Sequence, residues 1–288
     1  MNISPDNLLK SSHNLLNSVE ILNNLTSDKI SLKIMQDYYH FFSERVLDFT
    51  VENKKIFDVC GTGGSGKIRF NTSTALAIKM SENHTIAKHA NRASSGKIGS
   101  IDVLEFLNLP ICRDEIQALE ELNSRNLAFL LAPAFHPELV KLSAARREIS
   151  SPTVFNFIMP LLNPVKNISG QMIGVSNFKM MEKMAEIANF AKKNVIFVHD
   201  LDNKLDDVSI TGKTAIIEVL HGKITEYTVV PEDFDIPRVE SFAEISGFTN
   251  AKANADLILQ TLQGNSSVAY SNFLKINKIV AEGFFAKI

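Results

Sequence analysis

A glycine-rich loop constrains the fold of this chain more than any other segment. Gly61, Gly63, Gly64 and Gly66 follow directly on the short apolar run Lys55–Cys60. A run of β-branched and aromatic residues that ends abruptly in glycines predicts a buried strand followed by a tight loop. Because glycine tolerates positive φ, such a loop can turn repeatedly and point bare backbone N–H groups at an anion.

Polar side chains follow this loop where a helix is predicted to begin. Asn71, Ser73 and Thr74 stand at the start of the apolar stretch Ala75–Met80. The N-terminus of a helix has free N–H groups and a positive dipole end, and both favour phosphate. The segment Asp58–Thr74 therefore predicts a site for a phosphorylated ligand.

Two common nucleotide-binding signatures fit the loop only in part. Residues 61–66 satisfy the dinucleotide pattern G-x-G-x-x-G, but the acidic residue expected about twenty positions later would be Glu82, which precedes the next predicted strand. Residues 61–67 are one residue short of a P-loop, because Ile68 stands where Ser or Thr would hold Mg²⁺. Neither pattern assigns a function alone.

The composition is that of an ordinary globular protein. The 288 residues are 45% hydrophobic and 22% charged, which is enough to build a substantial core in one large domain or two unequal ones. A net charge of −2 gives no basic field for nucleic acid. Cys60 and Cys112 have no paired spacing, which suits a reducing compartment. There is no signal-peptide pattern and no apolar run near the roughly 18 residues of a membrane span, so we expect a cytoplasmic protein without membrane contact.

Hydrophobic periodicity predicts helices in residues 1–50 and an α/β fold after them. Ser4-Pro5-Asp6 supplies an N-cap and a proline at the first helical position, and apolar residues then recur at helical spacing. From Lys55 onward strands and helices alternate, which indicates a mostly parallel sheet covered by helices on both faces. The expected strands are Lys55–Cys60, Thr85–Ala90, Leu127–Ala132, Gln171–Ser176 and Val195–His199, with a hairpin of Ala215–Leu220 and Lys223–Val230. The expected helices are Ile101–Leu107, Arg113–Arg125, Lys179–Lys192, Ala251–Leu262 and Ser266–Ala286.

A second polar cluster begins at Lys88, where the strand Thr85–Ala90 ends. Ligands of open α/β sheets bind beyond the carboxyl ends of strands, so this cluster should face the same crevice as the glycine loop. Lys88 offers a cation, and the neighbouring neutral groups suit a polyphosphate. We expect His89 to have a structural role at the strand end and Arg92 to be a solvated charge. The neutral donors are Asn91, Ser94, Ser95 and Ser100.

Several motifs in a fixed order resemble the anthranilate phosphoribosyltransferase family. Gly-Thr-Gly-Gly is followed by Phe-Asn-x-Ser-Thr in residues 61–74, and Lys-His-x-Asn-Arg is followed by Gly-Ser-x-Asp-Val-Leu-Glu in residues 88–105. A third set lies in residues 132–164, with Ala-Pro, His-Pro, Arg-Arg-Glu and Pro-Leu-Leu-Asn-Pro, and a fourth in residues 198–214. The similarity extends from about Asp58 to the C-terminal helices, and ordered motifs are far more specific than one glycine loop.

The resemblance implies a fold and a reaction. It implies a small all-helical domain, residues 1–54 with a returning segment near 136–158, and a larger α/β domain, residues 55–135 and 159–288, with a central mostly parallel sheet flanked by helices and the active site in the cleft between the two domains. The reaction is transfer of the phosphoribosyl group of phosphoribosyl pyrophosphate to the amine of anthranilate, which releases pyrophosphate, in tryptophan biosynthesis. The resemblance also implies Mg²⁺ and a homodimer formed through the helical domain.

The same resemblance, with the chemistry of the side chains, gives a predicted site. Lys88, Asn91 and Arg146 are the predicted catalytic residues, and Arg146 would pair with the carboxylate of anthranilate, which Asn91 and Gly61 would also contact. Hard carboxylate oxygens suit Mg²⁺, and its predicted ligands are Ser73, Asp206 and Asp207. The residues predicted to bind phosphoribosyl pyrophosphate are Gly61, Gly64, Ser65, Arg69, Asn71, Ser73, Thr74, Lys88, Asn91, Ser94, Ser95, Gly96 and Ser100.

The chain also departs from the family pattern at six positions. Ser65 replaces an Asp, Arg69 replaces a small hydroxyl residue, and Asp207 replaces the Glu of an Asp-Glu pair. Ala90, Ile98 and Met159 replace Gly, Ser and Gly. These changes leave open a divergent phosphoribosyltransferase or a nucleoside-phosphorylase-like enzyme with another aromatic acceptor. A third hypothesis is a non-catalytic relative that binds nucleic acid or a partner protein, although the near-neutral charge disfavours nucleic acid.

Overall fold

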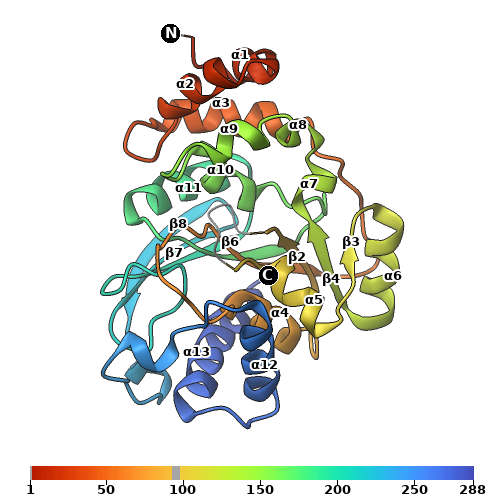
Figure 1. The fold of residues 1–288 in the computed structure, drawn as a ribbon. Coiled ribbons are helices and arrows are strands. Elements are labelled where there is room, and N and C mark those ends of the chain that lie inside the picture. The colour runs from red at the N-terminus through yellow and green to blue at the C-terminus, as the bar shows by residue number, and fades with distance from the viewer. Residues whose placement is uncertain (1, 93–97) are drawn as a thin grey trace.

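The computed structural model describes residues 2–92 and 98–288, and an eight-stranded sheet forms its centre (Figure 1). The strand order is β3-β4-β2-β1-β5-β6-β7-β8. Neighbouring strands from β3 to β6 are parallel, whereas β6, β7 and β8 pair antiparallel. Helices cover both faces, so the predicted α/β class with a mostly parallel sheet is confirmed.

The predicted strands and long helices are present, and most ends agree within two residues. The strands are β1 (Ile56–Gly61), β2 (Thr85–Ala90), β3 (Ile111–Cys112), β4 (Leu127–Leu131), β5 (Gly170–Gly174), β6 (Val195–Asp200), β7 (Thr214–Leu220) and β8 (Lys223–Val229). The α-helices are α1 (Pro5–Lys10), α2 (Leu15–Asn23), α3 (Leu32–Ser43), α4 (Thr72–Met80), α5 (Ser100–Leu107), α6 (Glu115–Arg125), α7 (Ala132–Phe135), α8 (Pro137–Val140), α9 (Ser143–Arg147), α10 (Val154–Ile158), α11 (Phe178–Phe190), α12 (Ala251–Leu262) and α13 (Val268–Phe285). Sequence periodicity missed β3 and the helices α7 to α10, because elements of two to five residues are too short to show a period.

Side chains alternate between two cores along the central strands. On β5 and β6, Ile173 and Phe197 belong to the core shared with the N-terminal helices and α11, whereas Met172 and Ile196 belong to the core under α4, α5, α12 and α13. All four side chains are at most 4% exposed. A strand whose successive side chains are buried on opposite faces needs mostly apolar residues, which explains why these segments are rich in hydrophobic residues.

The N-terminal helices lie together at one end of the molecule, near α9, α10 and α11 (Figure 1). The N-cap of α1 is Ser4, whose side chain accepts a hydrogen bond from the backbone of Asn7 at 3.3 Å, as the sequence predicts. Phe155 of α10 packs edge to face against Tyr38 and Phe42 of α3, with ring centroids 5.9 and 5.2 Å apart. These contacts join two segments more than a hundred residues apart in the chain. None of the described helices combines the length and the hydropathy needed to cross a membrane.

The strand order fixes where a ligand can bind. From β1 the chain passes to β2 on one side, and β5 returns to the other side of β1. Parallel sheets bind ligands where the strand order reverses, in the crevice beyond the carboxyl ends of the strands. The glycine loop follows β1 at this reversal.

Candidate functional site

The glycine loop lies between the carboxyl ends of β1 and β5 and has the backbone conformation that its glycines predict. Gly63, Gly64 and Gly66 have φ of 64°, 84° and 76°, a region that side chains disfavour. After β5, the Ser176 hydroxyl donates to the carbonyl of Gly63 at 2.6 Å, and the Ser176 amide donates to Thr62 Oγ1 at 3.3 Å. The two strands therefore fix the loop from its base.

Two polar side chains at the start of α4 are buried without a partner. Asn71 Oδ1 and Thr74 Oγ1 make no hydrogen bond to any described residue. Asn71 occupies the N-cap position of α4, but its side chain does not cap the helix. Buried polar atoms nearly always have a partner, so an orphaned pair beside a glycine loop and a helix N-terminus indicates a place for a polar ligand.

Lys88 lies beneath the glycine loop rather than in open solvent. Its side chain is 2% exposed, and its Nζ donates to the carbonyl of Val59 at 2.8 Å and to the hydroxyl of Ser73 at 3.1 Å. Burial lowers the pKa of the Lys88 ammonium, and the nearby carboxylate of Asp58 opposes that shift. Lys88 thus places a positive charge under the start of α4.

Asp58 is a buried residue of this region that the sequence motifs did not single out. Its carboxylate accepts hydrogen bonds from Asn163 Nδ2 at 2.9 Å, Gln171 Nε2 at 3.1 Å and the His89 backbone amide at 3.3 Å. Burial raises the pKa of Asp58, whereas the ammonium of Lys88 lowers it. An acid inside a fully buried strand was the signal in the sequence that could have revealed this network.

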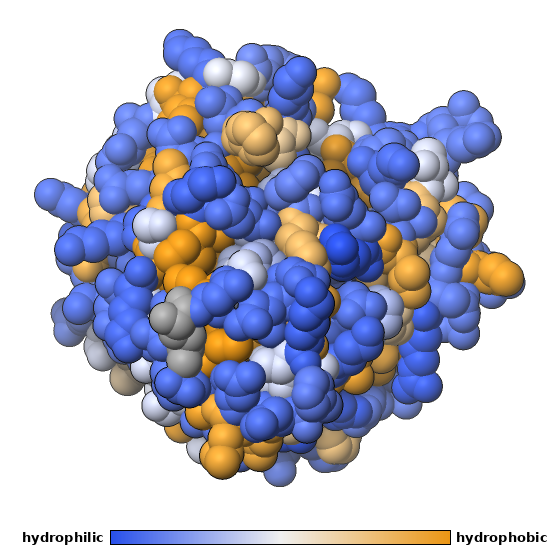
Figure 2. All heavy atoms as spheres, turned by 90° about the horizontal axis from the view of Figure 1, so that it is seen from above, coloured by the Kyte–Doolittle hydropathy of each residue, from blue (hydrophilic) through white to orange (hydrophobic). Residues whose placement is uncertain are grey.

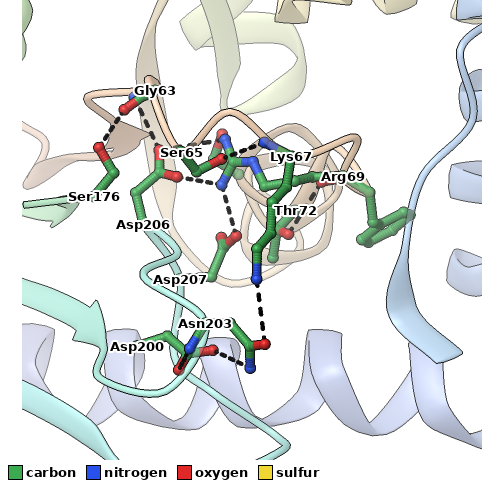
Figure 3. Close-up of polar contacts among 12 residues, drawn as sticks. Gly63, Ser65, Lys67, Arg69, Thr72, Ser176, Asp200, Asn203, Asp206 and Asp207 are labelled. Atoms are coloured by element: carbon green, nitrogen blue, oxygen red, sulfur yellow. Dashed lines mark hydrogen bonds and ion pairs between the residues drawn. The ribbon is translucent and has the colours of Figure 1, made fainter. Parts of the chain in front are cut away.

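The acids Asp206 and Asp207 follow β6 and reach the glycine loop. Asp206 Oδ2 accepts from the backbone amide of Gly63 at 2.9 Å. Arg69 pairs with both carboxylates: its Nη1 donates to Asp206 Oδ1 and, at 3.0 Å, to Asp207 Oδ2 (Figure 3). Burial raises the pKa of Asp207 to about 7, against the lowering effect of Arg69. Among residues 2–92 and 98–288, no group of three or more His, Cys, Asp or Glu is arranged to hold a metal ion.

Arg146, at the end of α9, is a half-buried cation that makes no ion pair with a described residue. Its guanidinium lies over the ring of Phe155, 5.3 Å from the centroid. Burial lowers the pKa of Arg146, and no neighbouring carboxylate opposes the shift. A guanidinium held without a counter-ion suits the carboxylate of a ligand.

Two histidines beside the same segment also have unsatisfied nitrogens. The rings of His89 and His136 lie 5.0 Å apart, and the Nε2 atom of each is buried without a partner among the described residues. Burial lowers the pKa of His136 to about 4 and that of His89 well below its usual range. Both rings are therefore neutral at pH 7. The sequence suggested a structural role for His89, and it marked His136 only as part of the His-Pro step of the third motif, with no role assigned.

The remaining predicted residues lie in the loops after β1 and β2 and at the start of α5. Asn91 is exposed just after β2, its Oδ1 accepting from the Arg92 amide at 2.8 Å, and Ser100 begins α5. The hydroxyl of Ser65 accepts from the Lys67 amide at 3.4 Å. Arg92, expected to be solvated, is exposed but pairs with two acids of α5. The predicted residues Ser94, Ser95 and Gly96 lie outside the described part of the chain.

Comparison with known proteins gives matches of sequence and of fold. Residues 53–282 match the family described as glycosyl transferase family, a/b domain. The chain is 36% identical over 233 residues to the anthranilate phosphoribosyltransferase of Dictyoglomus thermophilum, covering 80% of this chain and 68% of the relative. It is 38% identical over 234 residues to that of Priestia megaterium, covering 81% and 67%. The solved anthranilate phosphoribosyltransferase from Saccharomyces cerevisiae in complex with PRPP and Mg has a TM-score of 0.80 at 21% identity, covering all of this chain and 91% of the other.

Proposed function

The chain belongs to the anthranilate phosphoribosyltransferase family, within the glycosyl transferases of the matched a/b domain, and we propose from this premise that it is a transferase acting in tryptophan biosynthesis. It transfers the phosphoribosyl group of phosphoribosyl pyrophosphate to the amine of anthranilate. The products are N-(5-phosphoribosyl)anthranilate and pyrophosphate.

The observation that carries the donor site is the buried, unpartnered pair Asn71 and Thr74 beside the glycine loop. The Thr74 hydroxyl and the free N–H groups of a helix N-terminus donate to phosphate oxygens, whereas the Asn71 carboxamide oxygen is itself an acceptor and suits a hydroxyl donor of the sugar. Lys88 adds positive potential from below, where its charge is only weakly screened by water. The proposal also includes the predicted donor residues Gly61, Gly64, Ser65 and Ser100, which lie in the glycine loop and at the start of α5.

The acceptor site is proposed at Arg146, which would meet the carboxylate of anthranilate. The support is its half-buried guanidinium without a counter-ion, presented over Phe155. Asn91, at the end of β2, stands at the carboxyl edge of the sheet, where the donor would also lie.

The reaction requires positioning more than it requires a protein nucleophile. The bond from the anomeric carbon to a diphosphate oxygen breaks, a bond from that carbon to the anthranilate nitrogen forms, and the amine loses one proton. Positive charge develops on the sugar while negative charge leaves with pyrophosphate, as in other oxocarbenium-like displacements. Lys88 and the helix N-terminus stabilise the leaving charge, and Arg146 orients the amine.

Mg²⁺ is the proposed cofactor, supported by the S. cerevisiae relative, whose complex holds PRPP and Mg. Bound to a diphosphate, such an ion would neutralise charge on the leaving group. The predicted protein ligands Ser73, Asp206 and Asp207 do not form an open site, because each already accepts a hydrogen bond from a lysine or arginine. With these partners in place, the three side chains do not fit a resident Mg²⁺.

The same proposal includes two domains, a small helical one of residues 1–54 with a returning segment near 136–158 and a larger α/β one. It also includes a cytoplasmic location and a homodimer formed through the helical domain. Leu15 and Leu16, at the start of α2, are 46% and 81% exposed. Figure 2 views this end of the molecule and shows apolar side chains at several places on a mostly hydrophilic face. Light scattering on wild-type protein and the Leu16→Glu variant tests the dimer: a monomeric wild type would refute it.

The loss of anthranilate fluorescence tests the function. Purified protein with Mg²⁺ should consume anthranilate only when phosphoribosyl pyrophosphate is present. A second aromatic acceptor is the competing possibility, because half-buried Met159 replaces the family glycine and its backbone contacts His89. A panel of aromatic acids and amines decides between them. Turnover of another member without turnover of anthranilate would overturn the proposal.

A further inference from the structure

Arg69 occupies the position at which two carboxylates would otherwise attract a metal ion. Its guanidinium contacts both members of the acid pair Asp206–Asp207: Nη1 bonds to each carboxylate, and Nη2 lies 3.3 Å from Asp206 Oδ2. The two acid side chains are only 3% and 8% exposed, and that of Arg69 is 24% exposed. A single guanidinium charge thus faces two carboxylates that lie almost entirely inside the protein.

The backbone holds Arg69 in this place. Arg69 forms an antiparallel bridge with Ser246, and a Cβ on Gly247 would stand 1.9 Å from the Arg69 carbonyl oxygen. Only glycine permits this close approach of two chain segments. The backbone of Arg69 is therefore fixed against residues 246 and 247, and its guanidinium faces the acid pair (Figure 3).

The other oxygen ligands that a metal would use here are also engaged. Asp206 Oδ2 accepts from the Gly63 amide at 2.9 Å, and the Ser73 hydroxyl accepts from the Lys88 ammonium at 3.1 Å. A divalent ion between these groups would have to displace a buried arginine and lie close to a buried lysine. Removing one partner of a buried ion pair is strongly unfavourable, and like charges repel at short range.

We propose that Arg69 serves as a built-in cation at the acid pair Asp206–Asp207, so that the free enzyme binds no divalent ion there and takes up Mg²⁺ only with the diphosphate of its donor. This proposal rests on the proposed function for the identity of the donor. It assigns Arg69 as a positioning residue: it holds both acids and, through Asp206, the amide of Gly63 in the donor loop. The charge that a protein-bound ion would supply comes from the chain itself.

Metal binding to the full-length protein without substrate tests this proposal. Free Mn²⁺, measured by electron paramagnetic resonance, serves as the probe for wild type, Arg69→Ala and a matched control, Lys67→Ala. Lys67 is a cation of the same loop that contacts Asn203 instead of a carboxylate. We expect no saturable site in wild type or Lys67→Ala, and one site at least about tenfold tighter in Arg69→Ala, because two buried acids then lack a counter-charge. Adding Asp206→Asn to Arg69→Ala should abolish that site.

Two results would overturn the proposal. One is a stoichiometric Mn²⁺ site in donor-free wild type that Asp206→Asn removes. The other is a folded Arg69→Ala protein, with circular dichroism like that of wild type, that gains no site. If Arg69→Ala fails to fold, the wild-type titration and the milder Arg69→Gln variant still decide. Anthranilate consumption by wild type is measured separately, so a failure of the proposed function is distinguishable from a failure of this inference.

Discussion

Replacing Arg146 by Gln separates binding of the acceptor from every other property of the enzyme. The guanidinium has no counter-ion among the described residues and lies over the ring of Phe155, 5.3 Å from the ring centroid. Its role in the fold is therefore small: the lost cation–π contact is worth about 0.5–1 kcal/mol. Relief of a half-buried cation from desolvation offsets that loss, so the free energy of unfolding should change by about 1 kcal/mol or less.

The effect on acceptor binding should be much larger. A charge-assisted hydrogen bond is worth about 1.5–3 kcal/mol, and loss of a bidentate pair leaves the ligand carboxylate unpaired. A loss of about 3 kcal/mol corresponds to a rise in the KM for anthranilate of roughly 100-fold. The KM for phosphoribosyl pyrophosphate should change little, because the donor loop is formed by other elements.

Steady-state kinetics with each substrate varied in turn, together with urea unfolding, measures both quantities. The adjacent exposed residue Arg147 provides the control, since Arg147→Gln removes the same charge without removing the half-buried guanidinium. Equal increases in the two KM values, or an equal effect of Arg147→Gln, would refute the assignment of Arg146 to the acceptor. A loss of several kcal/mol in stability would refute the estimate of its structural role.

Three further predictions concern buried groups. The folded-state pKa of His136 is about 4, below the usual 6.5, so the unfolded chain binds more protons than the folded one between these pH values. The free energy of unfolding should therefore fall by about 3 kcal/mol as pH falls from 6.5 to 4, and urea unfolding of His136→Gln should not show this loss. If the variant loses stability with falling pH as steeply as wild type, the prediction is wrong. Asp58→Ala leaves the buried amide donors of Asn163 and Gln171 without their carboxylate acceptor and should cost about 3–5 kcal/mol in the same assay, whereas a loss below about 1 kcal/mol would mean that this hydrogen-bond network does not stabilise the fold. Gly174→Ala places a Cβ 1.8 Å from the backbone oxygen of Asp206 and should lower the melting temperature by several degrees, whereas its control Gly283→Ala, within α13 and in open space, should raise it slightly; equal behaviour of the two would contradict the close approach.

Local patterns predicted the elements of the sheet. Short segments rich in apolar residues gave β1, β2 and β6 within a residue or two, because strands buried on both faces need mostly apolar side chains. The long helices α6, α11 and α12 followed from their 3.6-residue period. The short helices between α6 and α11 could not be predicted in this way, since four or five residues show no period. Their positions depend on tertiary contacts: α9 contacts α2, α10 contacts α3, and α7 contacts β4 and α8.

The candidate site was predictable in its residues but not in their contacts. Asn71, Ser73, Thr74 and Lys88 were identified from residue chemistry and their positions at strand and helix ends. That two of them are orphaned, and that Lys88 lies beneath the loop, depends on the packing of β1, β2 and α4. The contact between His89 and His136 could not be predicted, because forty-odd residues separate the two histidines in the chain. No local sequence pattern shows that a ring nitrogen will be buried without a partner.

Local sequence patterns were enough to show that strands alternate with helices, that a glycine loop precedes a polar helix start, and that the motifs of a phosphoribosyltransferase occur in order. These are local properties, carried by neighbours along the chain. The ion pair between Arg69 and Asp206, which are 137 residues apart in the chain, became visible only in the folded structure. The sequence alone showed Arg69 as a departure from the family pattern near the predicted donor site, and it predicted Asp206 and Asp207 to be metal ligands. The pairing arises because the loops after β1 and β6 meet at one edge of the sheet. A carboxylate buried there needs a counter-charge, which Arg69 supplies.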